Sequence, residues 1–89
     1  MKTIWKYPFM IADHIELKVP KGARFLCADE QRAAPTMWFE VDPGEPLETA
    51  FFELRDTGQP FDGTEGRYLT TLMIAGGALV FHLYTRRPS

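Results

Sequence analysis

The adjacent glycines Gly76-Gly77 constrain the fold of this chain more than any other feature of its sequence. They separate two apolar runs, residues 67–74 and 79–85. A glycine pair between two strand-like runs is a strong signal for a tight β-hairpin. The sequence therefore predicts a hairpin here, and its two-residue turn fixes which residues lie opposite one another.

Pairing across this turn divides the predicted hairpin into two faces. Ala75 is expected to lie opposite Ala78, and the pairing continues outward until Leu69 lies opposite Tyr84. Opposed residues share a face of the ribbon. The first face carries Ile74, Leu79, Leu72, Phe81, Thr70 and Leu83. The second, called face two, carries Met73, Val80, Thr71, His82, Leu69 and Tyr84. The first face is predicted to be core, whereas face two is amphipathic and must be covered by another element or by a partner.

Further strands are predicted upstream of the hairpin. Strict alternation indicates strands over residues 14–19 and 36–41, and β-favouring residues indicate strands over 2–7 and 23–28. The side chains expected on one face of their strands are Ile15, Leu17 and Val19, then Phe25 and Cys27, then Met37, Phe39 and Val41. Arg24 and Leu26 are expected on the opposite face to Cys27. Residues 29–35 are polar and are predicted to be irregular.

The segment 46–55 allows two interpretations. Leu47, Ala50, Phe51 and Leu54 have the spacing of one helix face, with a proline at the entry. The same residues allow a strand over 50–55 with Phe52 and Leu54 inward. The strand is favoured because its surroundings are β and an isolated helix of this length is marginal.

Composition completes the prediction of fold class. The chain has 89 residues, of which 45% are hydrophobic and 25% charged, as in one small globular domain. We therefore expect residues 1–89 to form a single all-β domain of about seven mainly antiparallel strands, as a sandwich or an open barrel. One short helix near 46–55 is the alternative.

Charge and cysteine content restrict the environment and the partners. The net charge is −2, which argues against electrostatic binding of nucleic acid. The single cysteine allows no internal disulfide. The sequence shows no signal peptide and no apolar run that could span a bilayer. We expect a soluble cytoplasmic protein that has no membrane association.

Residues that could support catalysis or bind a metal do not form a recognisable set. The chain has two histidines and lacks the spacings of zinc sites, phosphate loops and nucleophile elbows. Cys27 is expected to be buried and inert. His82 opposite Thr71 could be drawn as a base and a nucleophile, but a packing or interface role is expected. The sequence predicts no catalytic residue, no cofactor, no metal and no enzymatic activity.

Aromatic side chains and one long loop are the remaining candidates for function. The rings could dock a partner or stack on a base, because aromatic residues dominate interface hot spots; the alternative is that they fill the core. The candidate interface residues are Trp5, Tyr7, Trp38, Met73, Val80, His82 and Tyr84. Residues 56–66 form a loop that is either functional or a flexible connector. Its candidate residues are Thr57, Gly58, Gln59, Phe61 and Asp62.

Several segments resemble a family of small proteins from tailed phages and prophages. The resemblance rests on KTIWKYP at residues 2–8, on PKGA at 20–23, on MW at 37–38, on TGQP at 57–60 and on GGALVFH at 76–82. Members of that family have a histidine where Gln59 stands, so no imidazole role in this loop carries over. The family looks all-β. The resemblance implies a phage accessory protein expressed in the cytoplasm of a host bacterium.

Together these observations favour a non-catalytic protein that binds, and thereby inhibits, a host macromolecule, such as a component of bacterial anti-phage defence. A second interpretation is an oligomeric protein that sequesters a small molecule or nucleotide, with a pocket formed by residues 57–66. A third is a structural or morphogenetic phage protein. Self-association through face two is also expected if that face is not buried within the domain.

Overall fold

The computed structural model describes residues 1–61 and 66–86, which form seven β-strands and no helix. The strands are β1 (Thr3–Pro8), β2 (His14–Pro20), β3 (Arg24–Gln31), β4 (Ala34–Val41), β5 (Leu47–Asp56), β6 (Tyr68–Ile74) and β7 (Leu79–Thr85). The described residues thus contain no helix that could cross a membrane. The predicted all-β class is confirmed.

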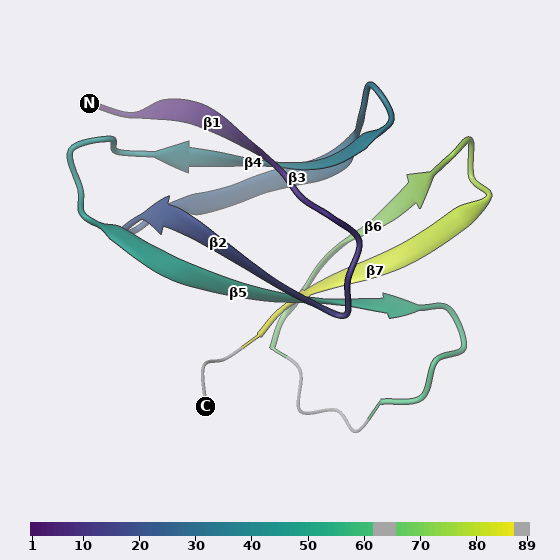
Figure 1. The fold of residues 1–89 in the computed structure, drawn as a ribbon. Helices are drawn as coiled ribbons and strands as arrows, with labels where there is room; N and C mark the ends of the chain where they lie inside the picture. The colour runs from purple at the N-terminus through teal and green to yellow at the C-terminus, as the bar shows by residue number, and fades with distance from the viewer. Residues whose placement is uncertain (62–65, 87–89) are drawn as a thin grey trace.

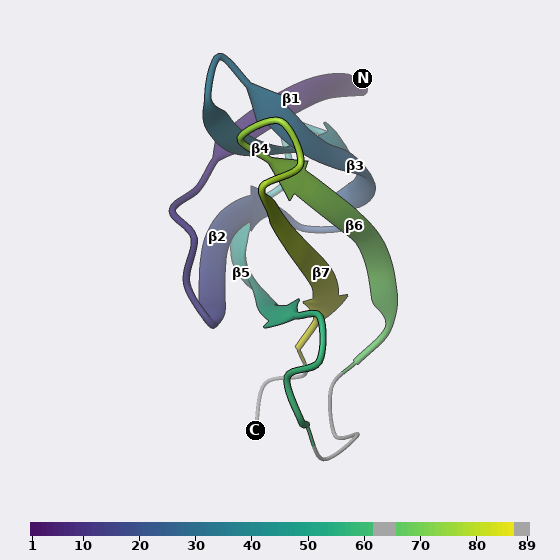
Figure 2. The same ribbon diagram turned by 90° about the vertical axis from the view of Figure 1, so that its right-hand side faces the viewer.

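The strands form two antiparallel sheets (Figure 1). The three-stranded sheet has the order β1-β4-β3, and the four-stranded sheet has the order β2-β5-β7-β6. Two of the pairings, β3–β4 and β6–β7, join neighbours in sequence, whereas β1–β4, β2–β5 and β5–β7 join distant segments. Strand β3 lies beside β6, so the sheets approach each other along one side of the domain (Figure 2).

The core lies between the sheets and follows the predicted alternation. Its buried hydrophobic residues are Phe9, Ile15, Met37, Phe39, Val41, Phe52, Leu54, Leu72, Ile74 and Leu83. The inward assignments for β2, β4, β5 and the first hairpin face are confirmed, with Leu17 and Phe81 packed against this cluster. Of the residues predicted on the first hairpin face, only Leu79, next to the turn, is exposed. The ring of Phe39 contacts Tyr7, Phe25 and Phe52, with ring centroids 5.5 to 6.0 Å apart. Edge-on and tilted aromatic contacts of this kind add to the apolar burial.

The ambiguous segment 46–55 belongs to a strand. Strand β5 pairs with β2 on one side and β7 on the other, so it is central in its sheet. Phe52 and Leu54 are buried, as the strand interpretation predicted. Pairing with two neighbouring strands stabilises β5, and it outweighs the propensity of a helix that would be too short to be stable by itself.

The expectation that residues 29–35 are irregular is wrong. Strand β3 runs on to Gln31, and β4 begins at Ala34. The turn between them is Arg32-Ala33, with φ angles of 49° and 66°. Positive φ at both central residues is the geometry of a tight hairpin turn, usually marked by Asn or Gly. An Arg-Ala pair gives no such signal, and the hairpin was missed for that reason.

The Gly76-Gly77 hairpin has the predicted register over most of its length. Pairs run from Ile74–Leu79 to Thr70–Leu83, and both glycines have positive φ. Beyond this the prediction that Leu69 opposes Tyr84 is wrong, because a bulge places Tyr68 opposite Tyr84. Leu69 instead packs against the core.

A second bulge overturns the prediction for Cys27. Register shifts between Phe25 and Cys27, so Cys27 pairs with Trp38 while Phe25 stays opposite Phe39. The shift moves Cys27 to the outer face, and its side chain is exposed rather than buried. One extra residue in a strand reverses every later side chain.

Candidate functional site

The hairpin's second face forms part of the outer surface of the four-stranded sheet. Met73, Thr71, Val80, His82 and Tyr84 alternate with core residues on β6 and β7. Met73 is 63% exposed, and the other four side chains are partly buried. Face two is therefore an outer surface of the domain and not the other half of its core.

The loop after β5 folds onto this surface. Thr57 Oγ1 lies 2.8 Å from His82 Nε2, and the ring of Phe61 lies 6.0 Å from that of Tyr84. Gln59 closes the turn, because its side-chain oxygen accepts a hydrogen bond from Asp56 N and its N–H donates to Asp56 O. The structure thus brings together two groups of candidates that are far apart in sequence.

Glycines shape both ends of the loop. Gly58 has a φ of +85°, which other residues rarely adopt. At Gly66 the backbone N–H donates to Thr85 O, and an added Cβ would lie only 2.6 Å from that oxygen. Only glycine fits so close to β7. The remaining loop candidate, Asp62, lies outside the described residues.

His82 is held by hydrogen bonds at both ring nitrogens. Thr71 Oγ1 lies 2.9 Å from His82 Nδ1, and Tyr68 Oη lies 2.7 Å from Thr71 Oγ1. A neutral imidazole donates through one nitrogen and accepts through the other, so Thr57 and Thr71 have opposite roles in this chain. The chain links the loop, β7 and β6 and fixes the orientation of the ring.

A buried carboxylate stabilises the centre of the same sheet. The side chain of Glu53 on β5 is only 9% exposed and accepts a hydrogen bond from Arg55 Nη2 at 2.6 Å. Arg86 Nε lies 3.4 Å from the other carboxylate oxygen, and His14 Nδ1 lies 3.7 Å from it. Two guanidinium groups and an imidazole thus surround one carboxylate, and the guanidinium groups supply the opposite charge that a buried carboxylate requires. Arg55 is two residues away on β5, whereas His14 on β2 and Arg86 after β7 are distant in sequence.

Three aromatic rings extend this surface toward the loop. Tyr68 and Tyr84 meet edge-on with ring centroids 5.6 Å apart, and the ring of Phe61 also packs against Tyr84. Phe61 is 52% exposed and Tyr68 is 50% exposed. Neither Phe61 nor Tyr68 was among the predicted interface residues, although Phe61 was a loop candidate. The bulge at Leu69 explains the omission of Tyr68.

The other predicted interface residues lie on the three-stranded sheet. Tyr7 packs against Phe39, and burial raises the pKa of its phenol above the ordinary value. Trp5 is opposite Phe39 and 38% exposed, whereas Trp38 is half-buried on the outer face. Trp38 lines a shallow hollow of about 380 Å³ with Ile4, Leu26, Cys27 and Asp29. The candidate interface residues therefore do not form one surface.

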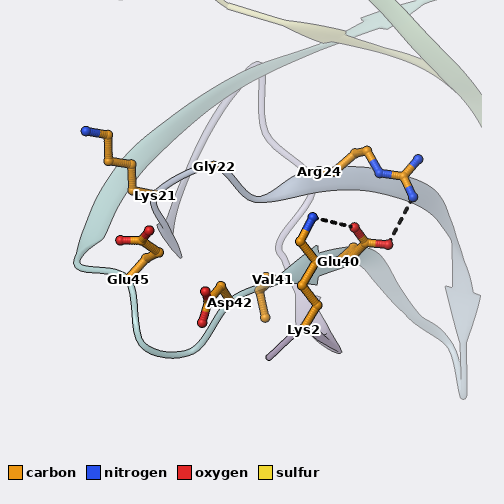
Figure 3. A pocket seen from close by; sticks show the side chains of 8 residues that line it. All are labelled: Lys2, Lys21, Gly22, Arg24, Glu40, Val41, Asp42 and Glu45. Atoms are coloured by element: carbon orange, nitrogen blue, oxygen red, sulfur yellow. Dashed lines mark hydrogen bonds and ion pairs between the residues drawn. The ribbon is translucent and has the colours of Figure 1, made fainter.

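A charged hollow of about 290 Å³ lies near the β2–β3 turn (Figure 3). Its lining residues are Lys2, Lys21, Gly22, Arg24, Glu40, Val41, Asp42 and Glu45. Hydrogen bonds from Arg24 and then Lys2 hold the pKa of the Glu40 carboxyl below its usual value. Cationic and anionic side chains are equal in number here, so the hollow has no net preference for an ion of either sign.

Metal-binding groups do not assemble in the part of the chain that the structure describes. Over residues 1–61 and 66–86, no three His, Cys, Asp or Glu side chains lie close enough to hold an ion. Exposed Cys27 has no such cluster around it.

Comparison with known proteins places the chain in a family. Searches of curated proteins and of solved structures find no match. Residues 1–89, the whole chain, match a family described as "Domain of unknown function (DUF7352)". The protein therefore belongs to the DUF7352 family.

Proposed function

We propose that this protein is a non-catalytic binding protein that docks a partner protein on the outer face of its four-stranded sheet. The observation that carries the proposal is the ring cluster of Phe61, Tyr68 and Tyr84. Exposed Met73 lies on the same face, at the other end of β6. Large aromatic and methionine side chains at the surface are typical of interaction sites.

Rigidity supports the same proposal. The hydrogen-bonded chain through Thr57, His82 and Thr71 fixes the loop against β7 before any partner arrives. A surface ordered in advance loses little conformational entropy on binding. The buried Glu53 ion pairs act in the same way on the neighbouring strands.

The resemblance to phage accessory proteins suggests where the partner is found. We propose a protein of the bacterial host, such as a component of an anti-phage defence system, whose activity is blocked by binding. Fold and family alone do not identify such a partner. The docking surface is the part of the proposal that this chain's own residues support.

Affinity capture from bacterial lysate with a matched pair of variants tests this proposal. Tyr68→Ala should lose a host protein that the native chain enriches, because it removes half of an exposed ring pair. Leu47→Ala changes a side chain that is 64% exposed but lies at the start of β5, and it should retain the same protein. Equal capture by both variants would contradict docking on this face.

Two other roles remain as alternatives with different outcomes. A sequestering protein should gain several degrees of thermal stability from a nucleotide, because a ligand present at about 100 times its Kd stabilises by about 2.7 kcal/mol. A morphogenetic protein should be present in purified virions.

A further inference from the structure

The two sheets have four edge strands, β1 and β3 in one and β2 and β6 in the other. Strand β3 lies beside β6, so among the described residues β1 and β2 are the outer edges. Among the described residues, β1 pairs only with β4, and β2 pairs only with β5. An uncovered edge presents unpaired backbone N–H and C=O groups, which can accept a strand from another chain. The edges differ in how well their side chains prevent such pairing.

The β2 edge carries the usual protection. His14, Glu16 and Lys18 are its exposed side chains, and the strand ends at Pro20, which has no N–H to donate. Charged side chains and proline are the common means by which edge strands avoid association.

The β1 edge is apolar instead. Ile4 is 60% exposed and Trp5 is 38% exposed. The flanking residues Met1, Met10 and Ile11 are exposed as well, at 103%, 86% and 40%. Among the described residues, half of the exposed large hydrophobic side chains fall within residues 1–11. Such a concentration of exposed apolar side chains along one edge strand indicates an interaction site.

Two lysines, Lys2 just before β1 and Lys6 within it, do not protect the edge. Lys2 Nζ lies 3.4 Å from Glu40 Oε1, and Lys6 Nζ donates to Gln31 Oε1 at 3.0 Å. Both ammonium groups therefore fold back over their own sheet, toward β4 and β3, and leave the outer side of β1 open.

We propose that β1 is a self-association edge, on which the β1 strand of a second copy pairs in antiparallel orientation. The two three-stranded sheets then become one continuous sheet. This surface is distinct from the outer face of the four-stranded sheet, so the proposal does not depend on the proposed binding of a partner protein.

Charge disfavours two registers of the pair. A two-fold axis centred on Ile4 would place Lys2 opposite Lys6 of the second copy, and an axis centred on Lys6 would oppose the two Lys6 residues. Like charges directly opposite each other are destabilising. An axis centred on Trp5 avoids both conflicts.

The Trp5-centred register also places complementary side chains together. The two Trp5 rings face each other, and cross-strand aromatic pairs stabilise antiparallel strands. Ile4 lies opposite Lys6 of the second copy, so that no lysine is placed directly opposite another lysine. The strand is therefore complementary to itself, which is the reason to name a second copy as the occupant.

Sedimentation velocity over a concentration series tests the proposal, with far-UV circular dichroism to verify folding. The native chain should dimerise. Ile4→Lys places a lysine opposite Lys6 of the second copy and should weaken dimerisation about tenfold or more, which corresponds to about 1.4 kcal/mol. The double variant Ile4→Lys/Lys6→Glu forms two opposite-charge pairs in this register and should recover the dimer.

Met73→Lys is the matched control, because Met73 is 63% exposed but lies on the other sheet. It should leave the dimer intact. A native chain that stays monomeric at its highest soluble concentration would overturn the proposal. Three other results would also overturn it. They are an Ile4→Lys variant that still dimerises, a double variant that dimerises no better than Ile4→Lys, and a Met73→Lys variant that dissociates. Partner capture through Tyr68 can succeed or fail independently of all these results.

Discussion

Thr57 and His82 are joined across the outer face of the four-stranded sheet, with 2.8 Å between Thr57 Oγ1 and His82 Nε2. This hydrogen bond connects a loop to the strand that follows it by 25 residues in sequence. It makes the loop part of the surface formed by β6 and β7. The proposed docking surface depends on this connection, which leads to the first prediction.

Replacing His82 with alanine should release the loop. The variant loses the hydrogen bonds to Thr57 and Thr71, and we expect a loss of unfolding free energy of about 1–2 kcal/mol. Hydrogen exchange measured by mass spectrometry should become faster at residues 57–61. His14→Ala is the control, because His14 lies on the same sheet but contacts Glu53. Unchanged exchange in the His82 variant would show that the loop does not need this anchor.

Leu83→Ala should be far more destabilising than Leu79→Ala. Both leucines lie on the inward face of β7, but Leu83 is 0% exposed whereas Leu79 is 50% exposed. Truncating a fully buried leucine costs about 2–5 kcal/mol, since a cavity adds to the lost burial. The exposed position should cost less than about 1 kcal/mol. Urea denaturation provides both values, and similar losses at the two positions would contradict the described packing.

Most of the fold could be predicted because the alternation of apolar and polar residues indicates both the strands and their inward faces. In β2, β4 and β5, each apolar residue on the predicted face is directed toward the core, as the period of two in a strand requires. The failures occur where the period is interrupted. Bulges at Leu26 and Leu69 shift the register, and neither leucine gives a local signal of a bulge.

The candidate site was less accessible to the same reasoning. Tyr84, Thr57 and His82 could each be named from the sequence, but their contacts depend on how a loop folds over a sheet. Glu53 was missed altogether. Arg55 lies two residues away on the same strand, but the contacts of Glu53 with His14 and Arg86 cross to β2 and to the residue after β7. Local periodicity does not indicate which strands distant in sequence pair with each other. In the sequence, a buried acidic residue cannot be distinguished from an exposed one unless its neighbours in the fold are known.

The bulge in β3 predicts that the thiol of Cys27 is reactive in the folded protein. Its side chain is exposed on the outer face beside Trp38, so Ellman's reagent should titrate the single thiol without denaturant. The double variant Cys27→Ser/Ala28→Cys moves the thiol to the next position, where Ala28 packs against the core. That thiol should react only as the protein unfolds. Protection of the native Cys27 would contradict the bulge.

Tyr7 should make the protein less stable at alkaline pH. Burial raises the pKa of its phenol above 10.0 in the folded state, so the unfolded chain loses the proton first as pH rises. The contribution of the protonated Tyr7 phenol to the free energy of unfolding is fully present below the ordinary pKa of tyrosine. It is lost as pH rises through the pKa of Tyr7 in the folded state. Tyr7→Phe should therefore show a smaller loss of unfolding free energy between pH 8 and pH 11 in chemical denaturation. An identical alkaline decline in both proteins would exclude this role for Tyr7.

Glu53 should be essential to stability only while its cationic partners are present. Glu53→Ala leaves Arg55, whose side chain is 13% exposed, without its 2.6 Å carboxylate contact. Removing one member of a buried ion pair lowers the free energy of unfolding by about 3–5 kcal/mol. Arg86 is partly accessible to solvent, so we expect a loss near the lower value.

The double variant Glu53→Leu/Arg55→Met replaces the pair with apolar side chains of similar length. It should recover most of the lost unfolding free energy, since buried ion pairs contribute little net stability over such replacements. Glu16→Ala, at an exposed position on β2, should change unfolding free energy by less than about 0.5 kcal/mol. Thermal and urea denaturation of the four proteins would separate the cost of removing the carboxylate beside Arg55 from the net contribution of the ion pair. A double variant no more stable than Glu53→Ala would show that the ion pair itself stabilises the sheet.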